Sequence, residues 1–156
     1  MPKSSLTIDR ATRGDIPRLL DLYEHLIPGD ERADDGAAIE AFERFLTYSG
    51  SAILIGEVDG VLAASCTLVV VPNLTRGATP YAIVENVVTH GAYRQQGYGR
   101  QLLDAATDAA WAEGCHKIML LTGSKDRGTF NFYLGAGFEQ SKTGFQKRRI
   151  PPKQDS

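Results

Sequence analysis

The sequence predicts an α/β domain with a mixed, mostly antiparallel central sheet, one parallel β-α-β crossover and helices on both faces. Two β-rich runs, 52–58 and 61–71, are joined by an Asp-Gly turn, which is the strongest short hairpin signal and predicts an antiparallel pair. A strand at 81–89, an amphipathic helix at 97–113 and a strand at 116–122 then follow one another. This order predicts a crossover unit whose two strands are parallel.

The remaining elements follow from apolar spacing and from residues that begin or end helices. Apolar residues from Ile16 to Ile27 follow the three-and-four spacing of one helical face, with Thr12 or Asp15 as the cap. Pro28-Gly29 ends that helix. The other predicted elements are a strand at 6–9, a helix at 36–48, a loop at 72–80, a helix at 128–135 and a last pair of strands at 138–141 and 144–149.

Length and charge exclude several classes of protein. The 156 residues suit one domain over 1–156, with its core at about 6–150. Apolar residues make up 42% and charged residues 23%, the balance of an ordinary globular protein. The formal net charge of −2 argues against a protein that coats nucleic acid or an anionic membrane.

The cysteine content and the first ten residues indicate the cellular compartment in which the protein is expected. Cys66 and Cys115 fit neither a metal-ligand spacing nor a disulfide framework, so no metal is expected. The opening residues MPKSSLTIDR contain no apolar run of the kind that secretory leaders carry. Both observations favour a reducing cytoplasm.

The most informative segment runs from Thr89 to Arg100, where a strand leads into a helix through Gly97 and Gly99. The glycines allow the backbone to approach a ligand, and the helix N-terminus offers unpaired N–H groups and a partial positive charge to a phosphate. A dinucleotide fingerprint is excluded because its third small residue would fall on Leu102. A nucleotide P-loop is excluded because no Gly-Lys-Ser/Thr follows.

Two motifs resemble those of a known family. Arg94-Gln-Gln-Gly-Tyr-Gly99 is similar to the Arg/Gln-x-x-Gly-x-Gly/Ala pyrophosphate loop of the GNAT superfamily of acetyl-CoA-dependent N-acetyltransferases. The segment Phe132–Phe138 resembles that superfamily's Phe-Tyr-x-x-x-Gly-Phe motif, and the order of elements fits over about 6–150. The short strings Glu85–Val88 and Gly114–Ile118 are similar to the glucosamine-6-phosphate N-acetyltransferase branch.

The resemblance implies a site for acetyl-CoA as co-substrate. In this superfamily the strand before the loop splays from its parallel neighbour, and its backbone pairs with the pantetheine arm. Gly91 stands where many relatives carry proline, which suggests a looser loop. The implied cofactor-binding residues are Val87, Val88 and Thr89 for pantetheine, and Arg94, Gln95, Gln96, Gly97, Tyr98, Gly99 and Arg100 for pyrophosphate.

Two side chains are candidate catalytic residues. Tyr133 is the candidate general acid for the departing thiolate, since a phenol and a thiol have comparable acidities. The alternative is an aromatic ring that only packs. With period-two alternation, Glu85 shares a face with Val87 and Thr89, from which it would bind the ammonium group or remove its proton. The alternative for Glu85 is a strand carboxylate paired with an arginine.

Candidate acceptor-binding residues are Tyr23, Asn73, Arg76 and Asn86, of which Asn86 reaches the face of Glu85 only if the strand carries a bulge. His25, His90 and His116 show no metal or triad spacing and are interpreted as structural or surface residues. The predicted activity is N-acetylation of a small primary amine in a ternary complex, without nucleic acid or membrane as partner. The alternatives are a protein or peptide N-acetyltransferase and a non-catalytic acyl-CoA-binding module. The oligomeric state is left open, with a homodimer as one alternative.

Overall fold

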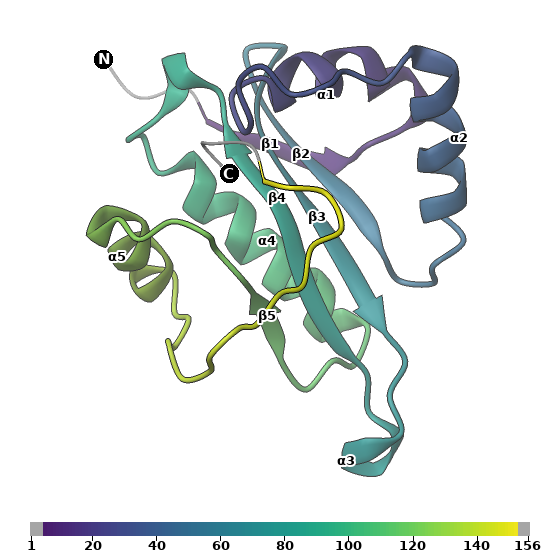
Figure 1. Cartoon of the computed structure of the whole chain (residues 1–156), viewed down its shortest axis with the longest axis vertical. Helices are drawn as coiled ribbons and strands as arrows, with labels where there is room; N and C mark the ends of the chain where they lie inside the picture. Colours follow the sequence, from purple (N-terminus) through teal and green to yellow (C-terminus); the bar gives the residue numbers. More distant parts are fainter. Residues whose placement is uncertain (1–4, 153–156) are drawn as a thin grey trace.

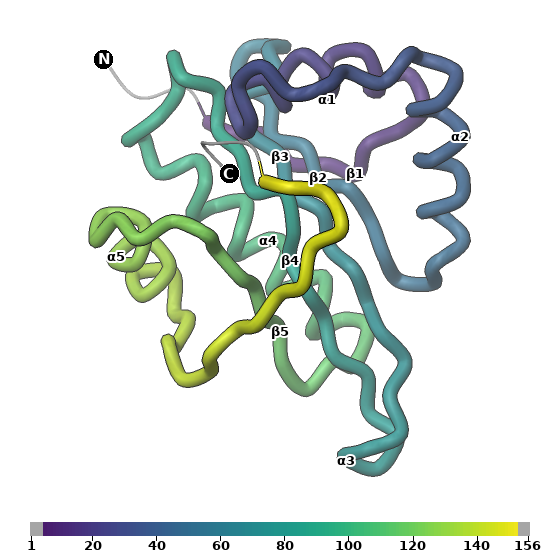
Figure 2. The backbone as a smooth tube through the Cα atoms, viewed as in Figure 1, coloured from purple at the N-terminus to yellow at the C-terminus, as the bar shows by residue number. Residues whose placement is uncertain are grey.

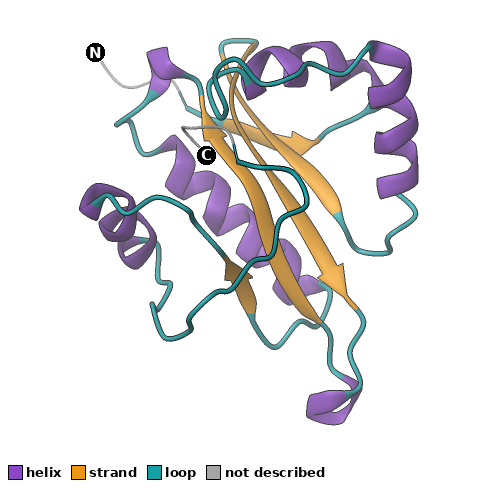
Figure 3. Cartoon of the chain, viewed as in Figure 1, coloured by secondary structure: helices purple, strands orange, loops and turns teal. Residues whose placement is uncertain are grey.

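The computed structural model describes residues 5–152, so the ends 1–4 and 153–156 of the predicted domain lie outside the described residues. Five strands form one sheet in the order β1-β2-β3-β4-β5 (Figures 1 and 3). Each neighbouring pair is antiparallel except β4 and β5, which are parallel. The strands are β1 (Thr7–Arg10), β2 (Ala52–Val58), β3 (Val61–Val71), β4 (Tyr81–Thr89) and β5 (Ile118–Leu120). The predicted fold class is confirmed.

Helices cover both faces of the sheet, and each face has its own core. The helices are α1 (Ile16–Tyr23), α2 (Asp35–Phe45), α3 (Thr75–Ala78), α4 (Tyr98–Ala112) and α5 (Arg127–Gly135), with 3-10 turns η1 (Arg13–Asp15) and η2 (Gly91–Tyr93). On one face α4 packs through Leu102, Leu103 and Ala106. On the other face α1 and α2 pack through residues such as Leu19 and Phe42. None of the helices described is long and apolar enough to cross a membrane.

Turn residues fix the elements that position the site. Asp59 and Gly60 both have positive φ, 50° and 79°, as the predicted two-residue hairpin requires. Gly114, with φ 81°, ends α4, and the next N–H, that of Cys115, donates to the carbonyl of Ala110. The helix α1 ends at Tyr23, four residues before the predicted end, and residues 24–27 form turns.

A bulge in β4 reverses which side chains face α4. Asn86 has φ 51°, and two residues of β4, Asn86 and Val87, lie opposite the single residue Cys66 of β3. Val84 and Val87 both pack in the α4 core, whereas Val88 packs in the core of α1 and α2. The expectation that Glu85, Val87 and Thr89 share one face is therefore wrong, because the bulge shifts the alternation between them.

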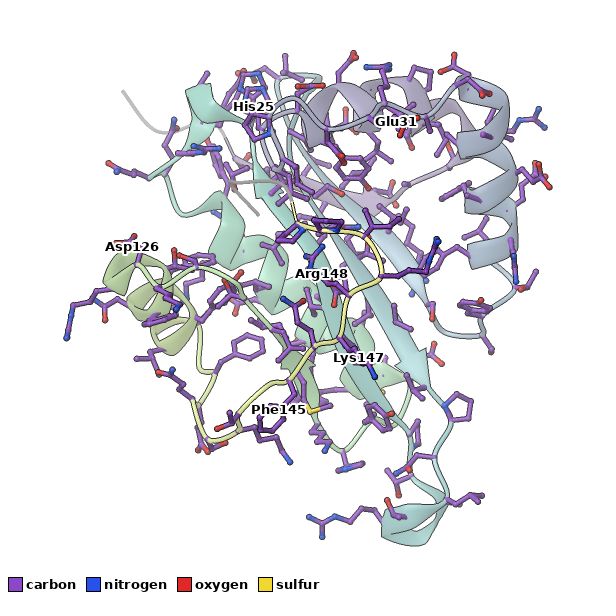
Figure 4. The ribbon with its side chains drawn as sticks, viewed as in Figure 1. His25, Glu31, Asp126, Phe145, Lys147 and Arg148 are labelled. Atoms are coloured by element: carbon purple, nitrogen blue, oxygen red, sulfur yellow. The ribbon has the colours of Figure 1, made fainter. Side chains whose placement is uncertain are left out.

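The predicted last pair of strands is absent from the described residues. Residues 138–150 form no strand, and every residue from 141 to 150 is exposed. Figure 2 shows this segment extended and passing in front of β4, while Figure 4 labels Phe145, Lys147 and Arg148 along it. Phe145 is followed by four polar or cationic residues, so the segment lacks the apolar alternation that would bury one face of a strand.

Candidate active site

The strands β4 and β5 separate midway along the sheet. Only Ala82, Ile83 and Val84 of β4 pair with β5, whereas β4 continues to Thr89 beside β3. Figure 1 shows the chain after β5 leading away from β4 toward α5. Among residues 5–152, no β5 residue pairs with Val87–Thr89. This open edge fits the predicted pairing of backbone groups with a pantetheine arm, and that pairing stays a prediction.

The two glycines of the predicted pyrophosphate loop serve different purposes. Gly97 is the N-cap of α4 with φ 82°, and a Cβ added there would meet nothing within 4 Å. It has no side chain to cover the first-turn N–H groups of α4, which leaves the space beside the N-cap open to an anion. At Gly99 an added Cβ would lie 3.1 Å from Phe132 Cζ and 3.4 Å from Thr89 Oγ1. Gly99 therefore allows α5 and the end of β4 to approach the start of α4.

The charged and amide side chains of the loop lie at the surface. Arg94, Gln95 and Arg100 are exposed, and Gln95 has φ 62°, which turns the backbone toward the helix start. The guanidinium of Arg94 donates to the carbonyl of Thr89 at 3.2 Å and to the carbonyl of His25 at 3.1 Å. Arg94 thus ties the loop to the end of β4 and to the end of α1.

Tyr133 lies on α5, next in the chain to Phe132, which packs at Gly99. Its ring centroid is 5.0 Å from that of Phe132 and 6.2 Å from that of Phe138, and it packs against the core beneath α4. Burial raises the pKa of the Tyr133 hydroxyl, with a smaller contribution from the Cys66 thiol. The hydroxyl therefore keeps its proton at neutral pH, as a general acid must.

Tyr23 and Glu85 are both neighbours of Thr67 on the opposite face of the sheet. Burial raises the pKa of Tyr23, and a hydrogen bond to the Thr67 side chain partly offsets that rise. Thr67 is paired directly with Glu85 across β3 and β4, so both side chains lie on the face covered by α1. Glu85 itself is exposed. Thr67 was not predicted from the sequence, where it is one of many residues in a continuous β-rich run.

Cys66 lies between these two groups of residues. It is fully buried opposite the bulge, and burial raises the pKa of its thiol to about 12. Its charge would raise the pKa of both Tyr23 and Tyr133, so both hydroxyls lie within electrostatic range of one thiol. The bulge residues Asn86 and Val87 thus lie opposite a buried thiol that influences both tyrosines.

The structure does not bring Asn73 or Arg76 to the bulge. The side-chain amide of Asn73 donates to Thr75 and to the carbonyl of Thr79, which stabilises the turn around α3. Arg76 is exposed in that turn, which lies at the far end of β3 and β4 (Figure 1). Asn86 is exposed at the bulge. The acceptor-binding roles of Asn73, Arg76 and Asn86 remain predictions.

Comparison with known proteins decides the family. A model of the acetyltransferase (GNAT) family matches residues 18–138, which span both motifs and the bulge. This chain belongs to the acetyltransferase (GNAT) family. The prediction of an acetyl-CoA-dependent N-acetyltransferase is thereby confirmed at the level of the family.

Individual GNAT relatives support the same assignment. A proposed acetyltransferase from Agrobacterium tumefaciens str. C58 is 43% identical, with a TM-score of 0.87 over 92% of this chain and 99% of that one. A glucosamine 6-phosphate N-acetyltransferase of Trypanosoma brucei brucei is 30% identical over 79 residues, which are 51% of this chain and 52% of that protein. The chain thus matches about half the length of this curated relative, in line with the resemblance to that branch.

The similarity to a third protein supports the GNAT fold and no more than the fold. The aminoglycoside N-acetyltransferase AAC(6')-Iy, whose structure is a complex with CoA, is 21% identical, with a TM-score of 0.77 over 96% of this chain and 98% of that one. That a protein of this fold holds CoA is consistent with the acetyl-CoA site predicted here.

Proposed function

We propose that this GNAT chain, as one domain over residues 1–156, transfers the acetyl group of acetyl-CoA to a small primary amine by direct attack in a ternary complex. The pyrophosphate lies on the N–H groups from Gln95 to Arg100, and the pantetheine arm lies along Val87–Thr89. Backbone N–H groups near Val88 and Thr89 polarise the thioester carbonyl. The amine nitrogen bonds to the acetyl carbon as the carbon–sulfur bond breaks, and Tyr133 protonates the departing sulfur. The nitrogen gives up one proton to Glu85 or to water, and Tyr133 regains a proton from solvent.

The observation that carries this proposal is the meeting of an open strand edge with an open helix end. The edge of β4 is unpaired with β5 after Val84, and a Cβ on Gly97, the N-cap of α4, would meet nothing within 4 Å. Phe132 packs at Gly99, and its neighbour Tyr133 packs against the same core as Val87 of β4. A thioester with a polyanionic end fits this arrangement, since N–H groups at a helix N-terminus favour anions.

The acceptor is proposed to enter from the face that α1 covers. Glu85 supplies a carboxylate there. Thr67 links it to Tyr23, because Thr67 is paired with Glu85 across the strands and is hydrogen-bonded to Tyr23. Two of the relatives named above act, by their names, on amino sugars: glucosamine 6-phosphate and aminoglycosides. We extend that substrate class to this chain and place the reaction in the cytoplasm, where acetyl-CoA is at hand and the free thiols of Cys66 and Cys115 stay reduced.

An acetyl-CoA turnover screen tests the proposed function. The purified chain is incubated with acetyl-CoA and amino sugars, amino acids, polyamines, aminoglycosides or peptides, and thiol release is followed with the product mass. We expect acetylation of at least one amino sugar or aminoglycoside. Turnover with peptides alone would support a protein acetyltransferase, and acetyl-CoA binding without any turnover would indicate a non-catalytic binding module.

Glu85 provides a pH-dependent prediction. Glu85→Gln keeps the size of the side chain and removes its charge and basicity. We expect turnover to fall about tenfold at neutral pH, the effect of losing a charged hydrogen bond to the acceptor. The loss should shrink as pH rises, because free amine then becomes abundant.

The measurement is a pH–rate profile for the wild type, Glu85→Gln and a control, Glu40→Gln, which alters an exposed carboxylate on α2. A profile of Glu85→Gln that coincides with that of the wild type would reduce Glu85 to a strand carboxylate without a role in the reaction.

A further inference from the structure

His25 contacts the loop that precedes α4, although it comes from the turn after α1. The N–H of Gly91 donates to Nδ1 of His25 at 3.2 Å. The ring of His25 lies against that of His90, with the two centroids 4.0 Å apart. Figure 4 labels His25 between α1 and the segment that leads from β4 to α4. A side chain 66 residues away in sequence therefore holds the first residue of this loop.

The direction of this hydrogen bond fixes the protonation state of His25. A backbone N–H can only donate, so Nδ1 must carry a lone pair and the neutral ring carries its proton on Nε2. Protonation of Nδ1 would put two donors face to face and break the bond. Position 91 must not be a proline, because proline has no backbone N–H to donate to His25.

A second hydrogen bond joins the same two segments, this time with the loop side chain as donor to the backbone of His25. The guanidinium of Arg94 donates to the backbone carbonyl of His25 at 3.1 Å and to that of Thr89 at 3.2 Å. The His25 clamp, meaning the Gly91–His25 and Arg94–His25 hydrogen bonds, thus joins the turn after α1 to both ends of the short segment 91–94. That segment leads directly into the Gly97 turn where α4 begins.

We propose that His25 is a positioning residue that holds the loop before α4 in the shape that binds pyrophosphate, and that only its neutral ring does so. The inference rests on the proposed function, since it assumes that this loop binds acetyl-CoA. It adds a link between the acceptor side of the site and the acetyl-CoA side, because α1 also carries Tyr23. Acetyl-CoA affinity should then follow the protonation of a side chain that does not touch the ligand.

The charged groups around His25 favour the neutral ring. Partial burial lowers the pKa of His25, and His90 and Arg94, both on the loop side, lower it further, whereas Glu24 on its own helix end raises it. The ring is therefore neutral above about pH 6.5, the ordinary value for histidine, and becomes charged only below it. The clamp and the native loop are favoured above that pH and lost as pH falls through the pKa of the folded protein.

The sign of the pH dependence separates the clamp from a simple charge effect. A positive charge on His25 near the loop would by itself attract the pyrophosphate, so affinity would rise on acidification. Loss of the Gly91–His25 bond has the opposite effect, because the N–H groups of the loop are no longer held in place. The proposal predicts that the second effect is larger.

The test uses His25→Ala, which removes the acceptor, and His25→Asn, which places an amide oxygen near the position of Nδ1 and does not titrate. Acetyl-CoA is titrated calorimetrically into each protein between about pH 5 and about pH 7.5, across the ordinary histidine pKa. At the upper pH we expect His25→Ala to bind about fivefold more weakly, the worth of one hydrogen bond, and His25→Asn to bind like the wild type. The wild type should lose affinity on acidification relative to His25→Asn, a comparison that cancels protonation of the ligand's own phosphates.

NMR of the ligand-free wild type tests directly whether the Gly91–His25 hydrogen bond forms. We expect His25 to carry its proton on Nε2 at neutral pH, and the Gly91 amide to be protected from exchange until His25 is protonated. An unprotected Gly91 amide, unchanged affinity in His25→Ala, or affinity that rises on acidification would overturn the proposal. If the wild type binds no acetyl-CoA, the proposed function fails and the coupling fails with it, while the Gly91 amide still decides whether the clamp exists.

Discussion

Tyr133→Phe should lower the rate of acetyl transfer about 10²-fold, or roughly 3 kcal/mol of barrier, in a single-turnover measurement. The substitution removes the hydroxyl that protonates the departing thiolate, and water replaces it only in part. The ring contacts with Phe132 and Phe138 remain, so fold and acetyl-CoA affinity should change little. The lower end of the range for general acid catalysis applies because a thiolate is a tolerable leaving group.

The experiment mixes enzyme in excess with acetyl-CoA at a saturating concentration of the acceptor and follows product by quenched flow. Single-turnover conditions are needed because slow product release would hide the loss in steady-state rates. Tyr48→Phe is the matched control, since Tyr48 packs on Phe45 near the end of α2, away from the site. A wild-type single-turnover rate in Tyr133→Phe would assign Tyr133 to packing and leave the acetyltransferase family assignment unchanged.

The arrangement of the sheet could be predicted from local patterns. The Asp59-Gly60 turn fixes the antiparallel pair of β2 and β3, and the strand-helix-strand order around α4 fixes the one parallel pair. The prediction of two C-terminal strands was wrong. Forming a strand requires a paired neighbour, and in the described chain residues 144–149 have none.

The parts of the site that a local motif determines through backbone conformation could be predicted. The parts that depend on contacts between distant segments could not. The glycines at 97 and 99 mark the start of α4 in the sequence, whereas the bulge at Asn86 depends on register with β3 and has no local signal. Thr67 beside Tyr23 and His25 beside Gly91 are contacts between segments more than 40 residues apart in the chain, which no spacing rule can find.

Gly97→Val should weaken acetyl-CoA binding about 10²-fold, the worth of one or two charge-assisted hydrogen bonds. The valine side chain would occupy the open space over the N-cap of α4 and keep the pyrophosphate away from the first-turn N–H groups. Part of its effect would be backbone strain, because Gly97 has φ 82°, which β-branched residues rarely adopt.

Gly114→Val provides the control for that strain. Gly114 ends the same helix with φ 81°, and a Cβ there also meets nothing within 4 Å, so the two substitutions impose similar strain at opposite ends of α4. Calorimetric titration of acetyl-CoA into the wild type, Gly97→Val and Gly114→Val tests most directly whether the start of α4 holds the pyrophosphate. We expect near-wild-type affinity for Gly114→Val and a loss of about 10²-fold for Gly97→Val alone. Equal affinities in Gly97→Val and the wild type would show that the start of α4 does not hold the pyrophosphate.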